Sequence, residues 1–337
     1  MSDRQLPNFA RVAWLEGPRQ LTFRDEPLAC PSPGELLCET IVTAISPGTE
    51  LAAFVGLPPL RPGRTYPRLQ GYCNVARVIA CGDAVEGFAP GDRVLTFSSH
   101  RSHFVIQADD ALVKLEEGDD AGAMACAYLF HLGYSALIAG GVRAGSNVAV
   151  VGLGVLGLTS VAMATVAGAR VTAISDHPEP RKLAASYGAA RCLTRDEARA
   201  GPNARTADVV IGTTGAWSDW DLGLVLAADR GVIATLGFPG RGQEPGAYNP
   251  LESRYFYDKQ LTIKAVGMLP ERNDSRHFLR FNERANLAYI ADLLRAGRLA
   301  SGPLISGRYP ANELAKAYQD LIDRTRSPVT YLLDWQT

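Results

Sequence analysis

The stretch NVAVVGLGVLGLTSVAMATVAGA, residues 147–169, holds no charged residue. An uncharged run of this length is long enough to cross a bilayer as a helix. Its glycines indicate a different structure, because Gly152, Gly154 and Gly157 follow the apolar run Val148–Val151 with the spacing G-x-G-x-x-G. A β-branched strand, a glycine turn and a helix that packs closely on the strand form a dinucleotide-binding βαβ fingerprint. The stretch therefore predicts a nucleotide site and not a membrane anchor.

The composition is that of a globular protein with balanced charge. The chain has 337 residues, with 34 Lys and Arg against 35 Asp and Glu, a net charge of −1. This length allows two domains, each with its own core. Balanced charge provides no basic field for nucleic acid or an anionic membrane, so we expect a small-molecule substrate and neither of those partners. The first residues do not resemble a signal peptide, so a cytoplasmic location is expected.

Two kinds of sequence follow one another along the chain. Residues 10–112 contain short apolar runs broken by glycine and proline, and they predict a β-rich, barrel-like domain. Strands are expected there at Arg11–Leu15, Leu21–Arg24, Leu36–Thr43, Val75–Ala80, Val94–Phe97 and His103–Gln107. A helix is expected at Asp120–Ala139. Strands and helices then alternate, which predicts a parallel sheet with helices on both faces.

The expected strands of this alternating part are Val148–Val151, Val171–Ile174, Val209–Ile211, Gly231–Gly237 and Leu261–Val266. One expected helix begins after the glycine turn and ends at Ala167. Two more are expected at Pro180–Tyr187 and around Trp217–Ala228. Two helices, Glu283–Ala296 and Ala311–Arg324, and a strand at Val329–Leu333 are expected to close the chain.

This order of parts resembles the medium-chain dehydrogenase/reductase superfamily, which includes zinc alcohol dehydrogenases and quinone reductases. The resemblance is carried by Pro33-Gly34-Glu35, the turn Ile45–Glu50, Gly91-Asp92-Arg93-Val94, the glycines at 152–157 and Gly188-Ala189. It implies an α/β fold, with a β-rich GroES-like catalytic domain at residues 1–118, completed by about 270–337. A Rossmann doubly wound parallel sheet would then occupy residues 119–269. The resemblance also implies a homodimer.

Three positions separate this sequence from the zinc-dependent members of that superfamily. Those members have Cys in the turn after the third strand, His-Glu after a later glycine, and Cys or Glu near the start of the long helix. Here Ser46, Gly71-Tyr72-Cys73 and, by register, Tyr128 stand at these positions. None of them keeps the ligand type that a catalytic zinc needs. The resemblance therefore implies a zinc-free member with no metal, and only Cys73 and Cys126 leave a metal site open.

The turn Ser46–Glu50, Ser-Pro-Gly-Thr-Glu, is similar to a Ser-Thr-Gly-Thr-Glu turn in bacterial dehydrogenases that act on the hydroxyethyl group of bacteriochlorophyllides. This similarity suggests secondary alcohols or ketones as substrates. Without zinc, side chains must stabilise charge on the substrate oxygen and exchange a proton. The candidate catalytic residues are Ser46, Thr49, Glu50, Tyr72 and His131.

The roles of these candidates differ. The Tyr72 hydroxyl is either a proton donor to the substrate oxygen or part of a wall that fills the space left by zinc. The imidazole of His131 suits proton exchange near neutral pH, although packed helix histidines are common. The resemblance implies that Thr49 and Glu50 either relay a proton or brace the site, and bracing of the turn is the preferred role for Glu50. His100 is expected at the surface.

The cofactor site is expected at the carboxyl ends of the parallel strands. Its predicted residues are Gly152, Gly154, Val155, Leu156 and Gly157, then Ser175, Asp176 and Arg181, then Thr214, Gly215, Gly237, Phe238 and Gly267. Ser175 stands where NAD enzymes usually have an acid, which favours the 2′-phosphate of NADP. Asp176 follows it and can bind a 2′-hydroxyl instead, with Arg181 as an offsetting cation. Both NADP and NAD stay open, with NADP preferred.

Three functions fit the sequence. The leading one is a zinc-independent, NAD(P)-dependent oxidoreductase that acts on a ketone or secondary alcohol. The second is a reductase of an activated carbon–carbon double bond, of the enoyl or quinone reductase type. The third is an NAD(P)H-binding sensor without catalysis.

Overall fold

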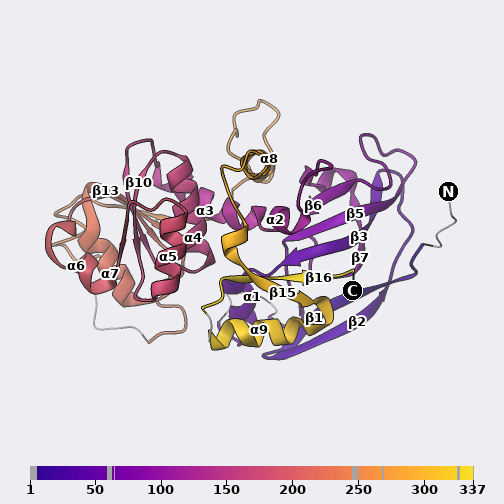
Figure 1. Cartoon of the computed structure of the whole chain (residues 1–337), viewed down its shortest axis with the longest axis horizontal. Helices are drawn as coiled ribbons and strands as arrows, with labels where there is room; N and C mark the ends of the chain where they lie inside the picture. Colours follow the sequence, from indigo (N-terminus) through magenta and orange to yellow (C-terminus); the bar gives the residue numbers. More distant parts are fainter. Residues whose placement is uncertain are drawn as a thin grey trace. The chain divides into compact units, whose positions relative to one another are not determined.

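The computed structural model describes residues 6–58, 63, 65–244, 249, 251–267, 269–324 and 327–336. The chain divides into two compact units (Figure 1). Unit 1 comprises Met1–Tyr128, Leu287–Arg295 and Ala300–Thr337, and unit 2 comprises Leu129–Asn286 and Ala296–Leu299. The first boundary falls about ten residues after the expected one, because helix α2 (Ala121–Ala125) packs on strands β3 (Glu35–Ala44) and β5 (Asn74–Cys81) of unit 1.

Unit 1 is built from two sheets. Over the described residues, the larger sheet has the strand order β15-β16-β3-β5-β6-β8, with β7 paired to β3, and the smaller sheet has the order β2-β1-β4. The remaining strands are β1 (Phe9–Gly17), β2 (Gln20–Pro27), β4 (Arg68–Leu69), β6 (Arg93–Thr96), β7 (His103–Gln107), β8 (Val113–Lys114), β15 (Ile305–Pro310) and β16 (Thr330–Asp334). One core cluster joins the sheets to helices α1 (Pro47–Phe54) and α9 (Leu314–Asp323), with Phe54 and Tyr318 in edge-to-face contact.

Unit 2 is a parallel sheet of the doubly wound type. Its strand order within the described residues is β11-β10-β9-β12-β13-β14. These strands are β9 (Asn147–Val151), β10 (Arg170–Ile174), β11 (Arg191–Leu193), β12 (Ala207–Gly212), β13 (Ala227–Thr235) and β14 (Thr262–Ala265). The helices are α3 (Ala127–Gly140), α4 (Val155–Val166), α5 (Pro178–Ser186), α6 (Arg195–Arg199) and α7 (Trp217–Leu226). Figure 1 shows α4 and α5 on one face of the sheet and α7 on the other. The order reverses beside β9, where such sheets bind their ligands.

The uncharged stretch 147–169 is the first strand and helix of this sheet. Val150 and Val151 are buried in β9, and Leu158 and Val161 are buried on α4. No helix in the described part of the chain has the length and apolar character needed to cross a membrane. The apolar side chains of this stretch are therefore covered by protein.

Several expected elements have different bounds in the structure. The helix expected at Asp120–Ala139 is divided into α2 and α3 at Cys126. The turn expected at Ile45–Glu50 continues as α1, because Pro47 occupies the first helical turn and the Glu50 carboxylate binds the Ser46 backbone N–H. Helix α7 ends at Leu226, two residues early.

The end of α7 has a physical cause in a buried lysine. The ammonium of Lys259 binds the carbonyls of Leu224, Val225 and Ala227 at 2.7 to 2.9 Å. A cation at a helix C-terminus satisfies carbonyls that the helix leaves open. Burial lowers the pKa of Lys259 to about 8. Strand β13 accordingly begins at Ala227, four residues before its expected start.

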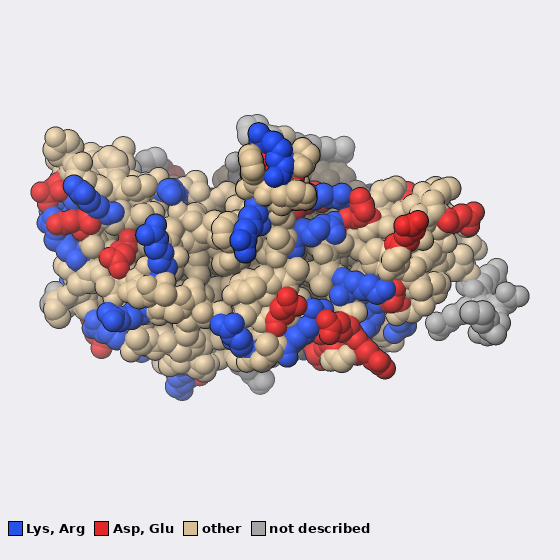
Figure 2. All heavy atoms as spheres, turned by 90° about the horizontal axis from the view of Figure 1, so that it is seen from above, with Lys and Arg blue, Asp and Glu red and all other residues tan. Residues whose placement is uncertain are grey.

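Charged side chains of both signs are distributed over the molecule. Figure 2 shows Lys and Arg interspersed with Asp and Glu on the face in view, with wide areas of other residues between them. This face lacks a broad field of one sign among its described residues, in accordance with the balanced charge of the sequence.

Candidate active site

Unit 1 places two hydroxyl groups in direct contact. Ser46 stands at the N-terminus of α1, and Tyr72 lies in the loop before β5. The Tyr72 hydroxyl donates a hydrogen bond of 2.5 Å to Ser46 Oγ. The Tyr72 ring meets Tyr128 edge to face, with the ring centroids 5.3 Å apart. Ser46, Tyr72 and Tyr128, which the sequence comparison expects at zinc-ligand positions, thus lie together as a hydroxyl pair and an aromatic ring.

The Tyr72 hydroxyl stays protonated. Burial is the largest influence on it and raises its pKa above the ordinary tyrosine value, and the nearby Cys73 and Glu50 act in the same direction. Hydrogen bonds with Ser46 and Thr49 oppose this rise without cancelling it. A protonated phenol beside a second hydroxyl can donate a hydrogen bond to a substrate oxygen.

Glu50 is the centre of a buried network behind the hydroxyl pair. Its side chain is 1% exposed. One carboxylate oxygen accepts the Ser46 backbone N–H at 2.6 Å. The other accepts the Tyr318 hydroxyl at 2.5 Å and lies 2.8 Å from His100 Nε2. His100 Nδ1 lies 2.8 Å from Thr43 Oγ1. Glu50 therefore braces the turn that carries Ser46.

Two members of this network were missed or misplaced by the sequence reasoning. His100 is fully buried, so the expectation of a surface residue is wrong. Tyr318 is also fully buried and reaches Glu50 from helix α9, 268 positions along the chain. The sequence signals neither contact, because buried polar partners are joined by the fold and not by spacing.

Gly71 fits closely against this network. Its φ is +84°, and a Cβ at this position would lie 2.6 Å from the His100 ring. Glycine is the residue that tolerates both this backbone conformation and this contact. The His100 ring thus restricts the backbone directly before Tyr72.

The thiols near the hydroxyl pair are shielded from solvent. Cys73 and Cys126 are fully buried. Burial raises the pKa of the Cys73 thiol well above its ordinary value, and it raises that of Cys126 to about 12. Both are therefore thiols and not thiolates at neutral pH. Across the residues the structure describes, no group of three or more His, Cys, Asp and Glu side chains could hold a metal ion.

His131 belongs to unit 2, on helix α3. Its side chain is 2% exposed, and burial lowers its pKa to about 4. Its Nε2 lies 3.8 Å from Glu283 Oε1. These surroundings are those of a packed helix histidine.

The glycines of unit 2 form a cradle whose geometry fits a phosphate group. Gly152 has a φ of +91°, and a Cβ on it would lie 2.4 Å from Thr214. A Cβ on Gly157 would lie 1.9 Å from the carbonyl oxygen of Gly152, so strand and helix touch there. Space is open beside Gly154, the N-cap residue of α4, and no side chain caps this helix. The free N–H groups, including those of Val155 and Leu156, fit a pyrophosphate at the helix N-terminus.

The end of β10 carries the residues expected to meet the ribose. Ser175 is buried, and its carbonyl accepts a hydrogen bond of 2.6 Å from the Arg181 guanidinium. Asp176 is exposed, and its carboxylate accepts from the backbone N–H and the guanidinium of Arg195, both at 2.9 Å. Arg195, at the start of α6, was not among the predicted cofactor residues.

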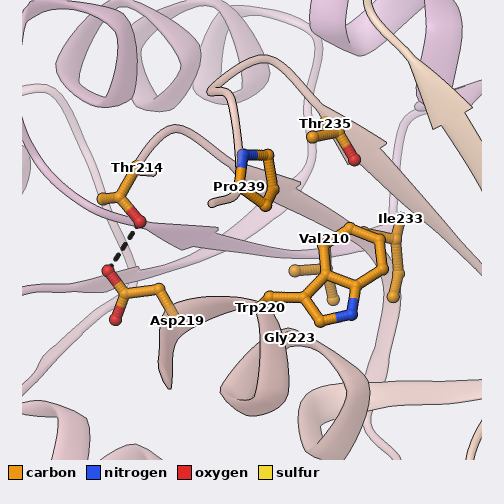
Figure 3. Close-up of a pocket in the computed structure, with 9 residues that line it drawn as sticks. Val210, Thr214, Asp219, Trp220, Gly223, Ile233, Thr235 and Pro239 are labelled. Carbon is orange, nitrogen blue, oxygen red and sulfur yellow. Dashed lines mark hydrogen bonds between the residues drawn. The ribbon is translucent and has the colours of Figure 1, made fainter. Parts of the chain in front are cut away.

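The loops after β12 and β13 interlock beside this site. A Cβ on Gly237 would lie 2.4 Å from the carbonyl oxygen of Thr214, and the Gly215 carbonyl accepts the Gly240 N–H. Phe238 is 45% exposed, and Gly267 follows β14 with open space around it. Figure 3 shows a small pocket here, in which the Thr214 hydroxyl binds the Asp219 carboxylate and Trp220 forms one wall. The predicted residues thus lie at the carboxyl ends of neighbouring strands.

The sequence matches known proteins over part of its length. Residues 155–284 match the family model described as zinc-binding dehydrogenase. The chain is 37% identical over 86 residues to 2-desacetyl-2-hydroxyethyl bacteriochlorophyllide A dehydrogenase of Cereibacter sphaeroides. The aligned segment covers 26% of this chain and 27% of that protein. The aligned part therefore spans only about a quarter of that relative.

Solved structures match the whole fold. A protein of Sinorhizobium meliloti 1021 with bound NADP has a TM-score of 0.77 and 22% identity, covering 97% of this chain and 100% of the other. Acetophenone reductase of Geotrichum candidum in complex with NAD has a TM-score of 0.77 and 18% identity, covering 98% of each chain. At these identities the likeness shows the fold, a Rossmann sheet together with a GroES-like domain.

Proposed function

We propose that this chain is a zinc-independent, NAD(P)-dependent oxidoreductase of the medium-chain dehydrogenase/reductase superfamily. The zinc-binding dehydrogenase match over residues 155–284 and the partly aligned bacteriochlorophyllide dehydrogenase support this assignment. The proposed reaction interconverts a ketone and a secondary alcohol of a small molecule. The observation that carries this proposal is the Tyr72–Ser46 hydroxyl pair. The resemblance implies zinc ligands at these two positions in the zinc-dependent members. The partly aligned relative is named for a hydroxyethyl compound, which supports the secondary-alcohol class.

The residues at these positions do not fit a zinc ion. Ser46 and Tyr72 offer protonated hydroxyls that are already hydrogen-bonded to each other. The nearby Glu50 carboxylate is bound by three partners, and the Cys73 thiol is protonated. A catalytic zinc takes three ligands from thiolates, imidazoles and carboxylates and keeps an open position. The proton chemistry therefore falls to the side chains of this site.

The side chains can carry the proton chemistry themselves. When bound, the nicotinamide supplies or accepts the hydride. The Tyr72 O–H turns from Ser46 Oγ to the substrate oxygen and transfers its proton as that oxygen gains negative charge. The Ser46 O–H then donates to the phenolate oxygen, and a proton from solvent restores the phenol before the next turnover. Ser46 orients the phenol, and Glu50 fixes the Ser46 backbone. The cradle at Gly152–Gly157 would hold the pyrophosphate of the cofactor.

A substrate panel tests the reaction. Purified protein is mixed with NADH or NADPH and with ketones, enones or quinones, and oxidation of the cofactor is followed by absorbance. We expect turnover with ketones, and with secondary alcohols in the reverse direction. Turnover with enones or quinones alone would replace the proposal by reduction of a carbon–carbon double bond. Cofactor binding without turnover on the whole panel would indicate a sensor.

Metal analysis tests the zinc-free assignment. Protein purified without chelator in zinc-containing medium should hold well below one zinc per chain, and treatment with a strong chelator should leave the ketone reduction rate unchanged. The reason is that two hydrogen-bonded hydroxyls replace the usual ligands. Stoichiometric zinc, with activity lost on its removal, would contradict this assignment.

A further inference from the structure

A chain of charge pairs runs across the carboxyl ends of three strands in unit 2. Asp176 follows β10, Arg195 follows β11, and Asp219 lies in the first turn of α7 after β12. The Arg195 guanidinium binds both Asp219 oxygens, at 2.5 and 2.8 Å. It also binds Asp176 at 2.9 Å, while the Thr214 hydroxyl donates to Asp219 at 2.7 Å. We call Asp176, Arg195 and Asp219 the Arg195 clamp.

The positive charge of Arg195 is paired with the carboxylates of Asp176 and Asp219. Asp219 is 5% exposed, so its charge requires a partner, and the bidentate pairing with Arg195 provides one. Hydrogen bonding to Asp219, with a further contribution from Asp176, raises the pKa of Arg195. The backbone N–H of Arg195 lowers the pKa of Asp176, and its guanidinium acts in the same direction. Two carboxylates therefore share one guanidinium, and the clamp carries a net negative charge.

Other cations near the end of β10 are engaged as well. Arg181 donates to the Ser175 carbonyl, and Lys182 binds Glu179 at 2.7 Å. A 2′-phosphate at this strand end would meet the Asp176 carboxylate and would have to draw Arg195 away from a buried acid. A 2′-hydroxyl can instead donate to Asp176 without disturbing the clamp.

We propose that Asp219 sets a preference for NAD over NADP, by holding Arg195 against Asp176 and away from a ribose 2′-phosphate. Asp219 acts through Arg195 and is a positioning residue. This inference rests on the proposed nicotinamide-dependent function, and it reverses the preference for NADP that Ser175 alone suggests.

Binding measurements test the inference without turnover. The dissociation constants of NADH and NADPH are measured by nucleotide fluorescence on the purified chain. For the unaltered chain we expect NADH to bind at least about 30-fold more tightly than NADPH, because the 2′-phosphate of NADPH would lie beside the Asp176 carboxylate. Asp219→Asn keeps a similar size and a partner for Thr214 but weakens the grip on Arg195. It should strengthen NADPH binding about 10-fold and change NADH binding less than about 3-fold.

Two further variants separate the mechanism from a general effect. Asp221→Asn is the matched control, since Asp221 lies on the same helix and pairs with Arg199 at 2.7 Å. In Asp221→Asn, the ratio of the NADPH dissociation constant to the NADH dissociation constant should equal that of the unaltered chain. The double variant Asp219→Asn with Arg195→Gln should lose the gain for NADPH, because that gain requires the freed guanidinium. Asp176→Ser removes the carboxylate at the exposed end of the clamp. Like Asp219→Asn, it should lower the ratio of the NADPH dissociation constant to the NADH dissociation constant.

The outcomes are distinct. Equal or tighter NADPH binding by the unaltered chain overturns the inference, as does an unchanged ratio in folded Asp219→Asn. If Asp219→Asn does not fold, an unchanged ratio in Asp176→Ser overturns it. Failure of the unaltered chain to bind either nucleotide contradicts the proposed function instead.

Discussion

Tyr72→Phe should lower kcat for ketone reduction by a factor of about 10² to 10⁴. The change removes only the hydroxyl that donates to Ser46, and it keeps the ring that contacts Tyr128. Loss of a proton donor acts on the transition state more than on substrate binding, so KM should change little. Steady-state kinetics with a saturating cofactor measure both parameters.

The matched control for this variant is Tyr309→Phe. Tyr309 also lies in unit 1 and donates its hydroxyl to a carboxylate, that of Asp320, and it should keep normal turnover. The pH profile gives an independent check. Because the pKa of Tyr72 is raised, the phenol remains a donor at high pH, and reduction should persist beyond about pH 10, the ordinary tyrosine value. Normal turnover in Tyr72→Phe would remove this residue from the mechanism.

The parallel sheet of unit 2 could be predicted from sequence because its signals are local. The glycine spacing at 152–157 and the β-branched runs, such as Val148–Val151, are readable without knowing the fold. The structure places five of the six described strands of unit 2 within four residues of the expected bounds, and β11 (Arg191–Leu193) was not predicted. Strand β15 was not predicted, since its exposed and half-buried residues alternate without a strong apolar face.

The candidate site could be predicted only in part. The sequence register predicts that Ser46, Tyr72 and Tyr128 occupy the positions of the three zinc ligands in the zinc-dependent members. In the structure their side chains lie together. The partners that hold them, His100 and Tyr318, come from distant segments and carry no spacing signal. Arg195 was missed for the same reason, because it reaches Asp176 and Asp219 only after the sheet has formed.

Glu50→Ala should lower the free energy of unfolding by about 3 to 5 kcal/mol, because it breaks a buried charged network and leaves its partners behind. The Ser46 N–H, the Tyr318 hydroxyl and His100 would lose their shared acceptor in a site without solvent. Each buried donor without an acceptor costs about 1 to 3 kcal/mol. Thermal unfolding should show a midpoint lower by about 10 °C.

Two variants show whether this loss belongs to the buried network. Glu16→Ala removes a surface carboxylate that also has two hydrogen-bond partners, Thr22 and Arg24. Because water replaces this carboxylate as the partner of both side chains, the thermal midpoint of the variant should stay near that of the unaltered chain. Tyr318→Phe removes one of the three contacts and keeps the ring against Phe54, so its loss should be smaller than that of Glu50→Ala. A Glu50→Ala midpoint no lower than that of Glu16→Ala would mean that the network contributes nothing to stability. In that case the rigidity of the Ser46 turn must come from the packing of α1 against α9 alone.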